Sequence, residues 1–331
     1  MKRLAVSALV CALAFAAAPL LAENGSNPGR GSRVVTRPGS SGAAVEPKAA
    51  TAGYTVQVNV VTRVQGTSFF RTAIDVTNNT STAGVTATHQ FCYTSGGVFQ
   101  GCSQRTAFPT LLALDNFHTD DIVQYIGSLG LLVPGADTSS FGTLLVDFTG
   151  LPSNHGWEGT VTARTYSPYS QANPALGTVA IAYPGSLFFE SSFGTLVGTI
   201  RDTRPAPTDA GVLRTNLGVT NTDVFGFGPV NAQISFYDVT PGSPTAGQRV
   251  GNFININNLA AGEVRQFNDV FSPSLGNIPA GVLSCIAFVD VTSPIPNPQK
   301  PPQIEGYIVI LDGGTQDGAY FEMKCAVGCP T

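Results

Sequence analysis

The chain contains the stretch Phe70-Arg71-Thr72-Ala73-Ile74-Asp75-Val76-Thr77-Asn78, which returns as Leu213-Arg214-Thr215-Asn216-Leu217-Gly218-Val219-Thr220-Asn221. The two copies are 143 residues apart, counted from Arg71 to Arg214. This spacing is the size of a domain and far exceeds the roughly 20–50-residue period of solenoids and propeller blades. The pair of stretches therefore predicts a duplicated module.

From residue 52 onward, short runs of β-branched and aromatic residues are interrupted by Gly, Pro and Asn. Apolar and polar residues alternate within many of these runs, which is the period of a half-buried strand. We predict strands at 54–61, 69–76, 85–93, 102–108, 142–148, 160–166 and 178–183, and again at 194–200, 212–220, 231–237, 249–256, 281–291, 304–311 and 319–325. The pattern predicts an all-β protein of two tandem immunoglobulin-like antiparallel β-sandwiches.

The first 22 residues have the pattern of a secretory signal peptide. Lys2 and Arg3 precede an apolar or small run from Leu4 to Ala18, and we expect cleavage after Ala22. A membrane anchor is the alternative, but a span needs roughly 20 apolar residues and a polar stretch follows at once. The predicted organisation is a signal peptide at 1–22, a flexible linker at 23–51, and β-sandwich domains at 52–188 and 189–331.

The charge of the chain argues against some classes of partner. Loss of Lys2 and Arg3 changes the balance from 17 minus 21 to 15 minus 21, which is −6. A negative chain is not expected to bind nucleic acid or an anionic membrane surface. Charged residues make up 11% of the chain, less than half of the roughly 25% usual in soluble domains, so uncharged polar groups must provide solubility.

Three stretches resemble a module of secreted bacterial β-sandwich proteins. They are Arg214-Thr215-Asn216-Leu217-Gly218-Val219-Thr220-Asn221, Thr160-Val161-Thr162-Ala163-Arg164-Thr165-Tyr166 and Arg265-Gln266-Phe267-Asn268-Asp269-Val270-Phe271. The resemblance covers nearly all of residues 52–325, although the first copy has Ala73 and Asp75 where the second has Asn216 and Gly218. It implies the fold and a surface or extracellular structural role, and it carries over no catalytic residues.

Five cysteines remain after the signal peptide, in a compartment where disulfides persist. Cys92 and Cys102 flank Gly96-Gly97, and a three-residue loop at 96–98 would place them opposite each other, so we predict a disulfide. If the last three strands form a meander, Cys325 pairs with Cys329 and Cys285 is a buried thiol. Another strand order would bring Cys285 to the tail.

The residues that could carry chemistry are few. His89, His118 and His155 have no metal-ligand spacing, and we predict no catalytic, cofactor-binding or metal-binding residues. The run His118-Thr119-Asp120-Asp121 is interpreted as a polar loop that enters a short helix at 120–126, with Asp as its cap. Arg71 and Arg214 are interpreted as solvent-side structural residues.

Two further sets of residues could bind a ligand. An aromatic face for sugar stacking could form from Trp157, Tyr166, Tyr169 and Tyr183, although a lone tryptophan is more often a core or rim residue. The stretch Asp312–Gly318 could offer oxygen ligands to calcium, but a hairpin turn explains it better. The exposed loop from Pro294 to Pro302, which includes Pro296 and Pro298, is a possible binding loop.

These observations predict a secreted or cell-surface, non-catalytic structural or adhesive protein. The expected partner is an extracellular protein or a glycan, with no nucleic acid and no integral membrane segment after signal cleavage. A carbohydrate-binding module protein is the first alternative, which aromatic side chains clustered on an exposed face would favour. A secreted hydrolase is the second, which needs an acid and a histidine or second acid within hydrogen-bond reach in a cleft.

Overall fold

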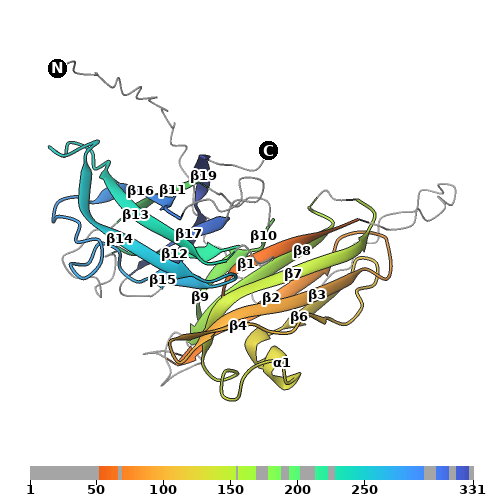
Figure 1. The fold of residues 1–331 in the computed structure, drawn as a ribbon. Coiled ribbons are helices and arrows are strands. Elements are labelled where there is room, and N and C mark those ends of the chain that lie inside the picture. Colours follow the sequence, from red (N-terminus) through yellow and green to blue (C-terminus); the bar gives the residue numbers. More distant parts are fainter. Residues whose placement is uncertain are drawn as a thin grey trace. The chain divides into compact units, whose positions relative to one another are not determined.

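The computed structural model describes residues 52–65, 69–153, 156–168, 178–187, 194–201, 213–222, 228–293, 303–312 and 318–327, which all belong to one compact unit, Pro47–Thr331. The described chain is almost entirely antiparallel β-structure with one helix, α1 (Ile122–Ser128), which confirms the predicted all-β fold (Figure 1). None of its described helices has the length and apolar character of a membrane span.

The first half forms one bent sheet. Its strands are β1 (Ala52–Gln65), β2 (Phe69–Asn78), β3 (Thr86–Ser95), β4 (Val98–Cys102), β5 (Thr106–Ala107), β6 (Asn116–Thr119), β7 (Ser140–Leu151), β8 (Gly159–Pro168), β9 (Thr178–Pro184) and β10 (Ser186–Leu187). The order is β4-β3-β7-β1-β2-β8-β9, with β10 beside β1, β5 beside β3 and β6 beside β2. Strand β1 pairs with β7 from Ala52 to Arg63 but joins β2 only from Arg63 to Gln65. Strands from both parts of this order, β4-β3-β7-β1 and β2-β8-β9, contribute side chains to one core, which includes Val58 of β1 and Ile74 of β2.

The second half contains two sheets. Its strands are β11 (Thr195–Arg201), β12 (Leu213–Asn221), β13 (Val230–Asp238), β14 (Arg249–Leu259), β15 (Val264–Phe267), β16 (Ser284–Val291), β17 (Ile304–Asp312), β18 (Gly318–Glu322) and β19 (Lys324–Val327). One sheet has the order β14-β13-β16-β11-β19 and the other β15-β12-β17-β18. Side chains from both sheets, such as Ile234 and Leu217, line a second core.

Most strand pairings of the first half recur in the second, but the described second half has no counterpart of the β1–β2 and β3–β5 pairings. Strand β1 lies between β7 and β10, as β11 lies between β16 and β19. Strand β2 lies between β6 and β8, as β12 lies between β15 and β17. Strand β3 joins β4 to β7, as β13 joins β14 to β16. Arg71 and Arg214 therefore lie on strands with equivalent neighbours, whereas β5 has no counterpart among the described strands of the second half.

Threonine in the repeated stretch makes the same hydrogen bonds in both halves. The Thr72 hydroxyl accepts from the Thr62 amide at 2.9 Å and donates to the Thr62 carbonyl at 3.2 Å. The Thr215 hydroxyl likewise accepts from the Arg201 amide at 3.3 Å and donates to the Arg201 carbonyl. Each buried hydroxyl therefore pairs with the amide and the carbonyl of one residue in the preceding strand. Without the hydroxyl, these two backbone groups would lose that partner.

Asparagine at the end of the stretch has an equivalent role. The Asn78 side-chain amide donates to the Thr82 and Leu112 carbonyls, at 2.8 Å each. The Asn221 amide donates to the Gly228 carbonyl at 3.2 Å and to the Leu259 carbonyl at 2.9 Å. These bonds connect two other segments of the chain to the end of each strand. This structural role explains why asparagine recurs at this position of the repeated stretch.

The disulfide Cys92–Cys102 confirms the predicted bridge, but the hairpin differs from the expected one. Ser95 pairs with Val98, so the turn has two residues, Gly96 and Gly97, with φ of 58° and 79°. A two-residue turn by itself would place Cys92 opposite Gly101. An irregularity between Cys92 and Thr94 shifts the register by one residue and brings Cys102 opposite.

The predicted meander of the last three strands is wrong, because β16 lies in one sheet while β17 and β18 lie in the other. Cys285 pairs with Ile200 on β11, and Cys325 pairs with Leu196 on the opposite edge of that strand. Strand β11 therefore separates the two cysteines. Cys285 is free and fully buried, and burial raises the pKa of its thiol to about 12. Cys325 is disulfide-bonded, while Cys329 lies outside the described residues, so their pairing stays a prediction.

Candidate functional site

The only described histidine with acids in reach is His118, and it lies on the edge strand β6. Its Nδ1 is 3.0 Å from Asp75 Oδ1 and its Nε2 is 3.3 Å from Asp120 Oδ1. The hydrogen bond to Asp75 raises the pKa of His118, and the bond to Asp120 acts in the same direction. His118 is 48% exposed, so this group lies on an open surface and not in a cleft that excludes water.

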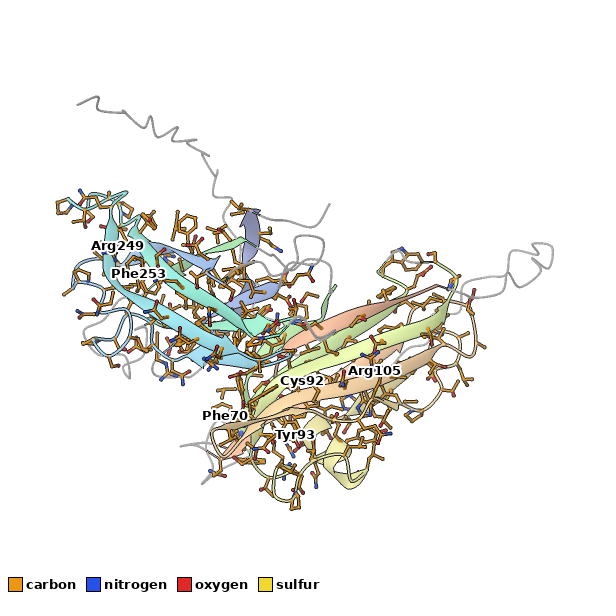
Figure 2. The ribbon with its side chains drawn as sticks, viewed as in Figure 1. Phe70, Cys92, Tyr93, Arg105, Arg249 and Phe253 are labelled. Carbon is orange, nitrogen blue, oxygen red and sulfur yellow. A yellow bond between two sulfur atoms is a disulfide. The ribbon has the colours of Figure 1, made fainter. Side chains whose placement is uncertain are left out.

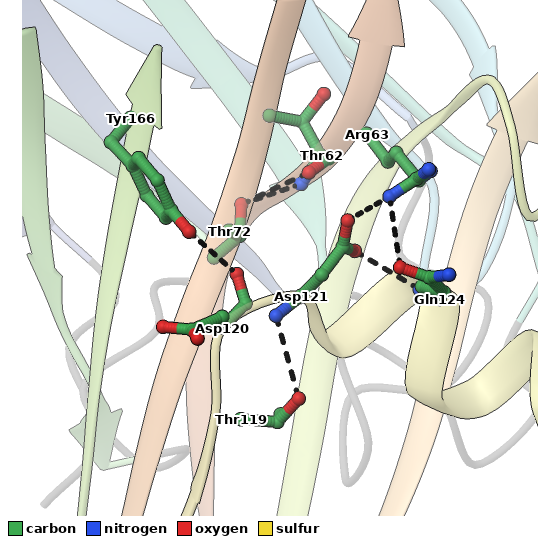
Figure 3. A network of polar contacts seen from close by, with 8 residues as sticks. All are labelled: Thr62, Arg63, Thr72, Thr119, Asp120, Asp121, Gln124 and Tyr166. Atoms are coloured by element: carbon green, nitrogen blue, oxygen red, sulfur yellow. Dashed lines mark hydrogen bonds and ion pairs between the residues drawn. The ribbon is translucent and has the colours of Figure 1, made fainter. Parts of the chain in front are cut away.

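The neighbouring acids have structural partners (Figure 3). Asp121 is the N-cap of α1, as predicted: its Oδ1 accepts from the Gln124 amide at 3.0 Å. Its other oxygen forms an ion pair with Arg63. The Tyr166 hydroxyl donates to the Asp120 carbonyl at 3.1 Å and ties this loop to β8. These contacts position the start of a helix.

The two arginines of the repeated stretch have different surroundings. The Arg71 guanidinium lies over the Tyr166 ring of the adjacent β8, 4.8 Å from its centroid. Arg214 instead lines a cavity between the two halves, so its predicted solvent-side placement is wrong. On the same face of β12, a Cβ at Gly218 would overlap the Tyr307 ring. The face that is open in the first half is covered in the second.

The cavity beside Arg214 has a volume of about 350 Å³. Apolar side chains from β1, β9 and β17 form most of its wall, and Arg214, Asn216, Gln266 and Asn268 add polar groups. The Asn216 Oδ1 accepts from the Asp269 amide at 3.0 Å, and the Gln266 Oε1 accepts from the Tyr307 hydroxyl at 2.9 Å. These bonds hold the polar wall of the cavity in place.

A buried polar network joins the halves next to this cavity. Gln57 donates to Asn59 Oδ1 at 2.7 Å and also to Glu305. The Ser186 hydroxyl donates to the other oxygen of Glu305 at 2.6 Å. Asn59 donates to the Tyr320 hydroxyl at 3.1 Å, and burial together with the Glu305 charge raises the pKa of Tyr320. Tyr307, Val309 and Leu311 of the second half belong to the same core as the first half.

A cluster of aromatic side chains lies on the face of the β14-β13-β16-β11-β19 sheet that points away from the second core. Tyr237 and Phe288 meet edge to face with centroids 5.4 Å apart. The Arg249 guanidinium lies 4.3 Å from the Phe253 centroid, and Phe253 is 44% exposed (Figure 2). We call Tyr237, Phe253, Phe288 and Arg249 the aromatic face. Alternation along β13 and β16 places these residues opposite buried ones such as Phe236 and Ala287.

The aromatic residues named from the sequence do not gather. Trp157 is 59% exposed and precedes β8, whereas Tyr166 lies near the other end of that strand. Tyr183 is buried against Tyr320 with ring centroids 5.1 Å apart, and Tyr169 lies outside the described residues. The aromatic face was missed because it forms from three strands that only the sheet brings together.

The possible binding loop Pro294, Pro296, Pro298 and Pro302 lies outside the described residues, as do residues 313–317 of the expected turn. Within the described part of the chain, no group of three His, Cys, Asp or Glu side chains is arranged to hold a metal ion. No known protein-family model matches the chain, and no curated protein matches it.

Proposed function

We propose that the protein is a secreted or cell-surface, non-catalytic structural or adhesive protein. The aromatic face carries this proposal, because it presents large side chains on a rigid sheet backed by a full core. Phe253 is exposed, and Tyr237 and Phe288 are half-buried. Aromatic groups held in fixed positions at a surface bind partners at low cost in side-chain entropy. The signal-like first 22 residues support export.

We also infer that the two halves arose by duplication as immunoglobulin-like modules. The matching strand pairings and the matching Thr72 and Thr215 bonds support this inference. The fused core and the bonds from Gln57 and Ser186 to Glu305 support a role as one rigid body, since separating the halves would leave buried polar groups unpaired.

Adhesion assays with the chain from residue 23 onward test the proposal. We expect immobilised protein to capture extracellular proteins or glycans, and Tyr237→Ala with Phe253→Ala to weaken capture while the melting temperature is kept. Deletion of residues 294–302 is the second variant, and we expect it to impair binding or surface assembly. Absence of capture by the unmodified protein on all surfaces would contradict an adhesive role.

The hydrolase alternative is tested separately through the His118 group. The triple variant His118→Gln, Asp120→Asn, Asp121→Asn removes the titratable groups, and asparagine at 121 keeps an N-cap for α1. We expect no measurable activity to change, because the group is exposed and its acids serve as structural partners. A hydrolytic activity that disappears in this variant would overturn the non-catalytic proposal.

A further inference from the structure

We propose that the aromatic face binds a neutral glycan chain laid across β14, β13, β16 and β11. This inference rests on the proposed adhesive function and names the class of ligand. Its ring groups come from Tyr237, Phe253 and Phe288, which three different strands bring to one side of the sheet. Sugar rings present flat C–H faces, and planar aromatic side chains provide matching apolar surfaces.

The rings on this face are held in position before any ligand arrives. The Arg249 guanidinium covers one side of the Phe253 ring and donates to the Gly251 carbonyl at 2.9 Å. Tyr237 is directly opposite Arg249 on β14 and opposite Ile286 on β16, and its ring meets Phe288 at an interplanar angle of 84°. Fixed rings lose little freedom on binding, which favours a ligand that makes weak contacts with each ring.

A polar row runs across the same four strands beside the rings. Asn255 is opposite Gln233, Gln233 is opposite Asp290, and Asp290 is opposite Thr195. Three interstrand steps of about 4.8 Å give this row a length of roughly 14 Å, which suits a short oligosaccharide. The row lies along the direction in which the rings are spread, so one extended chain can contact both.

The side chains in the row match hydroxyl groups, which both donate and accept. Gln233 Nε2 donates to Asn255 Oδ1 at 2.8 Å, so within the described chain Gln233 Oε1 is left as an acceptor and the Asn255 amide nitrogen as a donor. Thr195 donates to Asp290 Oδ1 at 2.6 Å, which fixes the carboxylate as a further acceptor. Sugar hydroxyls satisfy donors and acceptors at once, whereas a phosphate chain offers acceptors only.

The charges near the rings also favour a neutral ligand. Arg249 is engaged with Phe253 and Gly251, and Asp290 is a single carboxylate on the same face. A polyanion needs several cations along its path, and a polycation needs several acids. Along the proposed path this face carries Arg249, Arg201 of β11 and Asp290, and the polar row itself holds no cation, so the face offers no row of like charges beside its amides and hydroxyls.

Affinity electrophoresis provides the test, with the chain from residue 23 in gels that contain hydroxyethylcellulose, xyloglucan, laminarin or pullulan. We expect at least one of these neutral polysaccharides to retard the protein. The double variant Tyr237→Ala, Phe253→Ala should lower the affinity measured from the retardation about tenfold, because it removes one to two ring contacts with the polysaccharide. Trp157→Ala is the matched control, because it removes an exposed ring outside the face and should change nothing.

The outcomes separate this inference from the proposed function. If Trp157→Ala reduced the retardation as strongly as Tyr237→Ala with Phe253→Ala does, the binding site would lie outside the aromatic face and the inference would be overturned. Capture of extracellular proteins without retardation by any of the four polysaccharides would overturn the glycan class and leave the adhesive function standing. Failure of both protein capture and retardation would overturn both. Equal melting temperatures of the variants exclude loss of folding as the cause.

Discussion

Acid should destabilise the protein through His89, a buried histidine on β3. The side chain is fully buried, and neither ring nitrogen has a hydrogen-bond partner in the described chain. Its ring packs against Phe108 and Tyr125, with centroids 4.5 Å and 5.9 Å away. Burial lowers the pKa of His89 from 6.5 to about 4, because a charged imidazolium has no compensating contact there.

The direction and magnitude of this loss of stability follow from the pKa of His89 in the unfolded chain and in the folded chain. The unfolded chain binds a proton at His89 below pH 6.5, but the folded chain does so only below about pH 4. The contribution of neutral His89 to the free energy of unfolding is therefore complete above pH 6.5, and it is lost as the pH drops from 6.5 to 4. A difference of 2.5 pH units is worth about 3 kcal/mol in total, of which about 2 kcal/mol is lost by pH 5.

Urea unfolding of the wild type and of His89→Leu between pH 7.5 and 4.5 measures this effect. Leucine is apolar and close in size, so the variant keeps the packing and lacks the titration. The raised pKa of His118 acts in the opposite direction, but it is present in both proteins and cancels in their difference. We expect His89→Leu to gain about 2 kcal/mol relative to the wild type between pH 7.5 and pH 5. Parallel stability curves would refute the argument.

Two further substitutions test the packing. Cys102→Ser should lower the free energy of unfolding by roughly 3 kcal/mol, because it opens a loop closed over a separation of 10 residues; an unchanged urea midpoint would contradict this. Gly218→Ala should cost about 2–3 kcal/mol, because its Cβ would overlap the Tyr307 ring. The cost should shrink in a Tyr307→Ala background, whereas additive costs in a double-mutant cycle would show that the two sites do not interact.

Much of the strand pattern could be predicted from the sequence, because alternation of apolar and polar residues is a local property. The predicted strand at 69–76 falls within β2, and the predicted strand at 231–237 falls within β13. The helix and its cap at Asp121 also follow from local residues. The segment Asp269–Gly276 of the second half forms turns.

The sheet assignments could not be predicted in the same way, because alternation gives two faces but not what covers each face. Arg214 and Gly218 alternate as Arg71 and Asp75 do, yet their face packs against another part of the chain. The bridge between Cys92 and Cys102 was predicted with the wrong turn, since an irregularity in pairing leaves no clear mark in the sequence. The aromatic face needs the order of β14, β13 and β16.

The shared core also sets the order of events as the chain is made. Tyr307 packs in the core of the first half, 120 residues after Leu187, where the described part of that half ends. At the usual 5–20 residues per second, a ribosome needs about 6–24 s to add that length. During this interval the first half exists without Val309 and Leu311, which line a cavity together with Val60, and Glu305 has not yet reached Gln57. A translating ribosome therefore carries a first half whose uncovered apolar surface is available to chaperones, and a premature stop before β17 would leave that surface permanently open.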